Sequence, residues 1–88
     1  MDTIRVIFRA DRSGPFKGDA TAVFPDSPWN AANMTCYARI GKHSGCSLGW
    51  YRTTRPATPE EYAPLLAELR SIYETGDDHV RLVIAKRR

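Results

Sequence analysis

Residues 58 to 73 carry the strongest folding signal in this chain of 88 residues. Thr58 stands three residues before Glu61, which is the spacing of a capping box, and Pro59 occupies the first helical position. Apolar residues then recur at helical spacing and form one stripe: Tyr62, Leu65, Leu66, Leu69, Ile72 and Tyr73. Gly76 predicts the end of the helix. Such a helix needs a second layer to cover its stripe, and this requirement limits the folds open to the chain.

Four other segments are predicted strands: residues 3–9, 20–24, 34–40 and 79–85. The first, third and last alternate apolar and polar residues, and the second lies between turn residues and Pro25. We expect inward-facing side chains at Ile4, Val6 and Phe8 in the first segment. The same alternation points Met34, Cys36, Ala38 and Ile40 inward in the third, and Val80, Leu82 and Ile84 in the last. The order β-β-β-α-β predicts one α+β domain over residues 1–88. Its four-stranded, mainly antiparallel sheet has the single amphipathic helix packed on one face.

Residues 41 to 56 are the least regular stretch, with glycines at 41, 45 and 49. We interpret this stretch as a structured loop, since closely spaced glycines indicate a chain that turns repeatedly. The loop carries Trp50, Tyr51, Arg52 and Arg55, and large aromatic residues and arginines concentrate binding energy at interfaces. We expect one of Trp50 and Tyr51 to be buried and the other exposed.

The net charge of +3 is unevenly distributed. Residues 57 to 78 sum to −5 and the remainder to +8, so the folded domain should be electrically two-sided. The sequence has no run of 18 apolar residues and does not begin like a secretory signal. We therefore expect a protein of the cytoplasm, without membrane association and with Cys36 and Cys46 as free thiols.

On the face of the sheet away from the helix, the alternation places a set of basic, aromatic and aliphatic side chains: Arg5, Ile7, Arg9, Tyr37, Arg39, Arg81 and Val83. Three interpretations are open for this face. It is an ordinary solvated surface, a protein-binding surface, or a surface that holds nucleic acid through guanidinium groups and a stacked ring. The candidate partner-binding residues are Arg5, Arg9, Tyr37, Arg39, Trp50, Tyr51, Arg52, Arg55 and Arg81.

Cys36, His43, Cys46 and His79 are residue types that bind metals or act as nucleophile and base. Their spacing lacks the closely paired ligands of a structural zinc site, so we expect no metal and no other cofactor. His43 and Cys46 would form a catalytic pair only if the loop brought them within hydrogen-bond reach. A small-molecule substrate is not expected in a domain of this size.

The segment MTCYARIGKHSGCSLGWYRTTRPATPEEY, residues 34 to 62, resembles a family of small phage and mobile-element proteins of alphaproteobacteria. The resemblance continues through Leu65, Leu66, Leu69, Ile72 and Tyr73 and covers nearly half of the chain. The family includes candidate anti-CRISPR proteins, which are small inhibitors of type I CRISPR effector complexes. The resemblance supplies no catalytic residues. It implies a non-catalytic inhibitor that docks on such a complex in the bacterial host. The alternative is a small basic module with a nucleic-acid-binding or regulatory role. An enzyme built on Cys46 and His43 ranks third.

Overall fold

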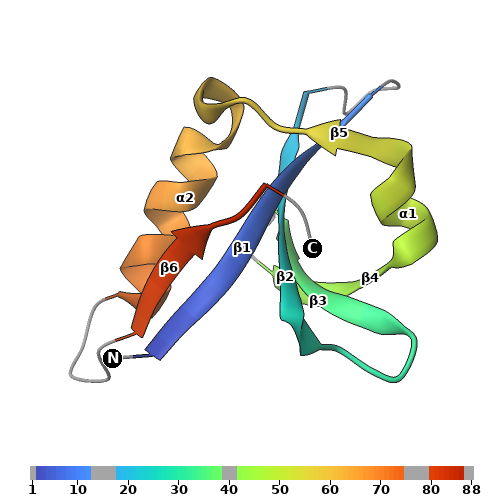
Figure 1. The fold of residues 1–88 in the computed structure, drawn as a ribbon. Coiled ribbons are helices and arrows are strands. Elements are labelled where there is room, and N and C mark those ends of the chain that lie inside the picture. The colour runs from blue at the N-terminus through green and yellow to red at the C-terminus, as the bar shows by residue number, and fades with distance from the viewer. Residues whose placement is uncertain (1, 13–17, 39–41, 75–79, 87–88) are drawn as a thin grey trace.

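A computed structural model describes residues 2–12, 18–38, 42–74 and 80–86 (Figure 1). In chain order the elements are β1 (Asp2–Asp11), β2 (Ala20–Pro28), β3 (Asn33–Ala38), β4 (Lys42–Ser47), α1 (Leu48–Thr53), β5 (Thr54–Pro56), α2 (Pro59–Tyr73) and β6 (Val80–Ile84). The α+β class and the mainly antiparallel sheet are confirmed. The described residues form six strands, where the sequence predicted four.

Strand β1 lies at the centre of the sheet because both of its edges are paired. Strand β2 pairs with it antiparallel, with Ile7 opposite Val23. Along the other edge, β6 runs parallel to the first half of β1 and β5 runs antiparallel to its end. The order is β4-β3-β2-β1-β5, with β6 beside β1, so the first and last strands of the chain are neighbours (Figure 1).

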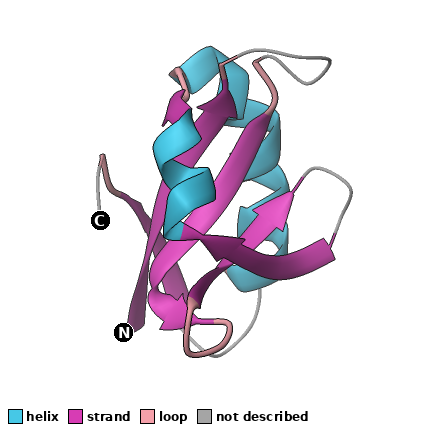
Figure 2. Cartoon of the chain, turned by 90° about the vertical axis from the view of Figure 1, so that its right-hand side faces the viewer, coloured by secondary structure: helices cyan, strands magenta, loops and turns pink. Residues whose placement is uncertain are grey.

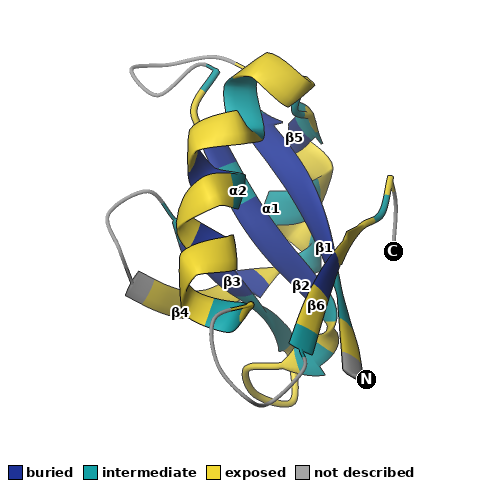
Figure 3. Cartoon of the chain, turned by 90° about the vertical axis from the view of Figure 1, so that its left-hand side faces the viewer, coloured by how far each residue is buried: buried dark blue, intermediate teal, exposed yellow. Residues whose placement is uncertain are grey.

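Helix α2 begins where the capping box predicted. The amide of Glu61 donates to Thr58 Oγ1 at 3.3 Å, and the amide of Thr58 donates back to Glu61 Oε1 at 2.9 Å. The helix lies across β1 and β2 and leaves its outer face exposed (Figure 3). Leu65 and Leu69 are buried in a core shared with Val6, Phe8, Ala22, Phe24, Tyr37 and Leu82. The predicted packing of this helix on the sheet is therefore confirmed.

The opposite face of the sheet is also covered. The short helix α1 lies over it, so the sheet stands between two helices (Figures 1 and 2). A second, smaller core forms there from Ile7, Val23, Cys36 and Cys46, with Trp50 and Tyr51 of α1 packed against it. We call this side of the molecule the α1 face. It consists of the four residues of the second core, the residues of α1, and Arg9, Arg12 and Thr21.

The prediction of a loop over residues 41 to 56 was wrong, because the stretch contains β4, α1 and β5. Strand β4 has the sequence KHSGCS, which is poor in strand-forming residues. Its conformation comes from pairing with β3 along its whole length, from Asn33 opposite Ser47 to Ala38 opposite Lys42. Tertiary pairing of this kind overrides local propensity, and the sequence alone does not reveal it.

The predicted outer face of the sheet was also wrong at three positions. Ile7 and Arg9 are 1% and 9% exposed, because α1 and β5 cover them. Tyr37 is 4% exposed and lies on the α2 side, whereas Cys36 faces α1. Alternation separates an inner from an outer face only when one face meets water. Here both faces are covered, so the pattern in β3 did not decide between them.

Smaller differences concern the ends of elements. Leu82 is buried as expected, but Ile84 is 41% exposed, and Ile72 at the end of the helical stripe is 46% exposed. The expectations for Arg39, Ile40, Gly76 and His79 lie outside the described residues.

Candidate functional site

Thr54 is the residue that fastens α1 to the sheet. Its hydroxyl donates to the carbonyl of Tyr51 at 2.6 Å, and its amide closes the end of α1 on the same carbonyl. The Thr54 hydroxyl also accepts from Arg9 Nε at 2.8 Å. The start of α1 is capped by Ser47, whose hydroxyl accepts from the amide of Trp50 at 3.0 Å. These contacts fix the positions of Trp50 and Tyr51 over the sheet.

Two arginines meet at the Thr54 carbonyl. Arg9 Nη2 donates to this oxygen at 2.6 Å and Arg12 Nε donates to it at 3.1 Å. The Arg9 guanidinium also lies over the Tyr51 ring, with its central carbon 4.4 Å from the ring centroid. Among the residues that the structure describes, neither arginine forms an ion pair. The cluster therefore carries positive charge that no described carboxylate neutralises.

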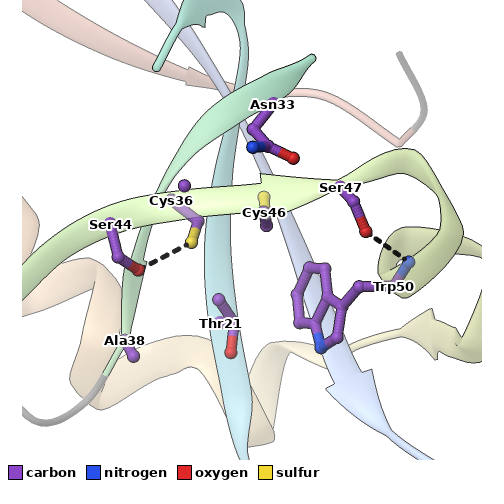
Figure 4. A pocket seen from close by; sticks show the side chains of 9 residues that line it. Thr21, Asn33, Cys36, Ala38, Ser44, Cys46, Ser47 and Trp50 are labelled. Carbon is purple, nitrogen blue, oxygen red and sulfur yellow. Dashed lines mark hydrogen bonds between the residues drawn. The ribbon is translucent and has the colours of Figure 1, made fainter. Parts of the chain in front are cut away.

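A cleft of about 500 Å³ opens between α1 and strands β3 and β4 (Figure 4). Ser44 and Trp50 lie towards its two ends, with Cys36 and Cys46 between them (Figure 4). All of its lining residues are uncharged: Thr21, Asn33, Cys36, Ala38, Ser44, Gly45, Cys46, Ser47 and Trp50. The volume lies in the range of small-ligand sites.

The two thiols in this cleft are buried. Cys36 Sγ lies 3.3 Å from Ser44 Oγ, and both cysteines are free. Burial, with a smaller contribution from the neighbouring Cys36, raises the pKa of Cys46 to about 12. The Cys46 thiol therefore stays protonated at neutral pH, which makes it a poor nucleophile.

His43 is not within reach of Cys46, because the two side chains point to opposite faces of β4. The His43 ring lies on the α2 side, where Nε2 is 2.6 Å from the hydroxyl of Tyr73. It also contacts the rings of Phe24 and Tyr37. The catalytic pair that the sequence left open is not assembled. Within the described part of the chain, no three of the His, Cys, Asp and Glu side chains are grouped as metal ligands.

Of the nine candidate binding residues, the eight that the structure describes do not form one surface. Arg9 and Tyr37 are buried, and Arg55 is held by Glu61. Trp50 and Tyr51 are both half-buried, so the expected division into one buried and one exposed ring was wrong. Arg52 is exposed on α1, Arg81 is exposed on β6, and Arg5 is paired with Asp26 at 2.7 Å. Arg39 lies outside the described residues.

The sequence did not single out Arg12, Thr21 or Thr54, which complete the site. Arg12 stands one residue beyond β1, and its alignment with Arg9 depends on the Thr54 carbonyl. Nothing local marks a threonine or an arginine for such a contact. The pairing of β1 with β5, in which Asp11 lies opposite Thr54, brings Arg12 and Thr54 together.

Comparison with known proteins adds no relative: no family model, no curated protein and no solved structure matches the chain. Neither described helix is both long enough and apolar enough to cross a membrane.

Proposed function

We propose that this chain is a non-catalytic binding protein of a mobile genetic element, which inhibits a CRISPR effector complex by docking on it through the α1 face. The observation that carries the proposal is the uncompensated positive charge of this face. Arg12 and Arg52 are exposed there, and neither forms an ion pair with a residue that the structure describes.

The opposite side of the molecule has the reverse charge. Four glutamates and one arginine lie along α2 and its C-terminal cap: Glu60, Glu61, Glu68, Arg70 and Glu74. A small domain with two faces of opposite sign is turned by an anionic partner so that its basic face meets that partner. This supports α1, rather than α2, as the docking side.

The α1 face also carries aromatic residues on a fixed frame. Trp50 and Tyr51 are held by the two caps of α1, and Tyr51 is stacked on Arg9. Rigid aromatic side chains beside arginines are typical of residues that dominate binding energy at interfaces. Cys46 in the same cleft has a pKa of about 12, and a thiol that stays protonated favours a binding role over nucleophilic chemistry.

The CRISPR effector complex is the partner implied by the resemblance over residues 34 to 62 to mobile-element proteins. This segment includes α1, which contributes Trp50, Tyr51 and Arg52 to the α1 face. CRISPR effector complexes hold RNA, and single-stranded DNA once a target is opened, so they present the anionic chemistry that this face fits.

The test is a phage challenge of cells with an active type I CRISPR system that express the protein. Arg52→Glu should abolish inhibition, because it reverses an exposed charge on the docking face. Arg70→Glu is the matched control, since Arg52 and Arg70 are both exposed arginines in the last turn of a helix. Both variants should keep the circular dichroism spectrum of the wild type.

The outcomes separate the two parts of the proposal. Wild-type protein that leaves CRISPR immunity intact removes the effector complex as the partner. Equal inhibition by the two variants removes the α1 face from the mechanism. Loss of inhibition with Arg70→Glu alone would move the docking surface to α2.

A further inference from the structure

We infer that the α1 face binds a single-stranded segment of nucleic acid, with a phosphate on Arg9 and Arg12 and an adjoining base in the cleft beside Trp50. The inference rests on the proposed function in using the same face, and it names the chemical class that this face contacts.

The arginine pair has the features of a built phosphate site. Arg9 is only 9% exposed and is held at Nε and Nη2 by Thr54, so its guanidinium has a fixed orientation. Arg12 donates to the same carbonyl, which brings two positive charges close together. Like charges held this close repel, and an anion between them relieves the repulsion. Arg9 Nη1 has no hydrogen bond with a residue that the structure describes, which leaves it available to a phosphate oxygen.

The cleft beside this pair suits an uncharged, flat group with polar edges. It is lined by hydroxyl, amide and thiol groups and by the indole of Trp50. The hydroxyl of Thr21 and the indole N–H of Trp50 form no hydrogen bond with any described residue. A nucleobase combines a ring face for stacking on an aromatic side chain with donors and acceptors at its edge.

The two halves of the site are neighbours in the sheet. Arg9 lies directly opposite Thr21 in the pairing of β1 with β2, and Thr21 lines the cleft. Adjacent strands are about 4.8 Å apart. The arginine pair and the cleft therefore lie beside each other over neighbouring strands, as the phosphate and the base of a nucleotide lie beside each other.

This arrangement favours a single strand over a duplex or an acidic peptide. A base that is stacked and paired in a duplex cannot enter a side-chain-lined cleft without leaving the helix. An acidic peptide would engage the arginines, but its side-chain carboxylates would find no cation among the residues that line the cleft.

The test is fluorescence anisotropy with short labelled oligonucleotides: single-stranded DNA, single-stranded RNA and a DNA duplex. We expect the wild type to bind at least one single strand more tightly than the duplex. Trp50→Leu should weaken binding between about 5-fold and 150-fold, the range for removal of one stacked base. Trp29→Leu is the matched control, because the Trp29 ring lies over Gly45, on the face of β4 away from Cys46.

Arg12→Gln is the second variant, because Trp50 packs on the second core and its replacement could disturb folding, whereas Arg12 is exposed. This change should weaken binding and make the slope of log K against log salt shallower by about 0.7 for each phosphate that the variant no longer neutralises. Binding of the wild type to no single strand, or unchanged binding by both Arg12→Gln and a folded Trp50→Leu, overturns the inference.

The inference and the proposed function fail separately. Oligonucleotide binding without inhibition of CRISPR immunity retains the nucleic-acid site and removes the effector complex as the target. Inhibition without oligonucleotide binding retains the proposed function and indicates an acidic protein surface as the contact.

Discussion

Arg55 and Glu61 form a bidentate ion pair that joins β5 to α2. Both guanidinium Nη atoms reach the carboxylate, at 2.7 Å and 2.6 Å, and the amide of Thr58 donates to the same group at 2.9 Å. Such a bidentate pair is both stronger and more directional than a single charged hydrogen bond. One side chain of α2 therefore closes the helix cap and also ties the helix to β5.

This contact predicts a specific pH dependence of stability. Hydrogen bonds from Arg55, and then from the amide of Thr58, lower the pKa of Glu61 from 4.5 to about 2. A carboxyl group whose pKa is lower in the folded state stabilises the fold fully above its ordinary pKa. This stabilisation is lost as the pH falls through the folded value. Glu61→Gln should therefore reduce stability at pH 7, and the difference from wild type should shrink between pH 4.5 and pH 2.

Urea unfolding of wild type and variant at several pH values measures this difference. Glu60→Gln is the control, because Glu60 lies in the same first turn of α2. Glu60→Gln should show any general change in stability that comes from removing a negative charge near the start of the helix. If the loss of stability in Glu61→Gln stays constant down to pH 2, the Arg55–Glu61 ion pair contributes no charge-dependent stability.

At the scale of elements, the residues of the α2 stripe are buried to different extents. Leu69 is fully buried between the helix and the sheet, whereas Ile72, one turn later on the same predicted stripe, is 46% exposed. Tyr73, the next residue, packs on the main core and lies 2.6 Å from His43 of β4, so Ile72 alone of these three residues turns away from the sheet.

This difference in burial predicts unequal costs for two similar substitutions. Leu69→Ala should destabilise the protein by about 2 to 5 kcal/mol, because it leaves a cavity in the core. Ile72→Ala should cost less than about 1 kcal/mol, as is usual for a surface position. Denaturant unfolding of the two variants is the measurement, and equal losses would place Ile72 in the core.

The sequence predicted α2 well because its cap, its stripe and its core contacts all lie within one continuous segment. It predicted β1, β2, β3 and β6 in outline for the same reason, since their alternation is local. It missed β4, α1 and β5, which depend on partners elsewhere in the chain. Helix α1 has six residues, including Gly49, and is too short to be stable without the contacts of Ser47 and Thr54.

The candidate site was predicted less well than the fold, for a related reason. Trp50, Tyr51 and Arg52 were found by residue type alone. Arg9 was expected on an open face, although it is covered by the unforeseen α1 and β5 and serves to position α1. Arg12 enters the site only because Thr54 accepts from both arginines. A contact between residues 42 positions apart has no signature in a single sequence.

At the scale of the whole molecule, β6 completes the fold. It pairs with β1 from Asp2 to Val6 and contributes Leu82 to the main core. The amide of Leu82 also donates to Glu74 Oε2 at 2.8 Å, which joins the strand to the end of α2. The central strand therefore obtains partners from both the start and the end of the chain.

Removal of residues 79–88 should consequently abolish cooperative unfolding, since it exposes one edge of β1 and opens the core at Leu82. Removal of residues 87 and 88 alone is the control and should leave the melting curve unchanged. Thermal melting followed by circular dichroism makes the comparison. A sharp transition in the shorter chain would show that the first five strands and α2 fold without β6.

The pairing of the first strand with the last also has a consequence for synthesis in the cell. Ribosomes add about 5 to 20 residues per second, so the segment that contains β1 emerges several seconds before β6 exists. During that time the edge of β1 from Asp2 to Val6 lacks its final partner, and unpaired strand edges promote association with other chains. Native closure of the sheet must follow the synthesis of β6, and until then the nascent chain depends on its partial sheet or on chaperones to stay unaggregated.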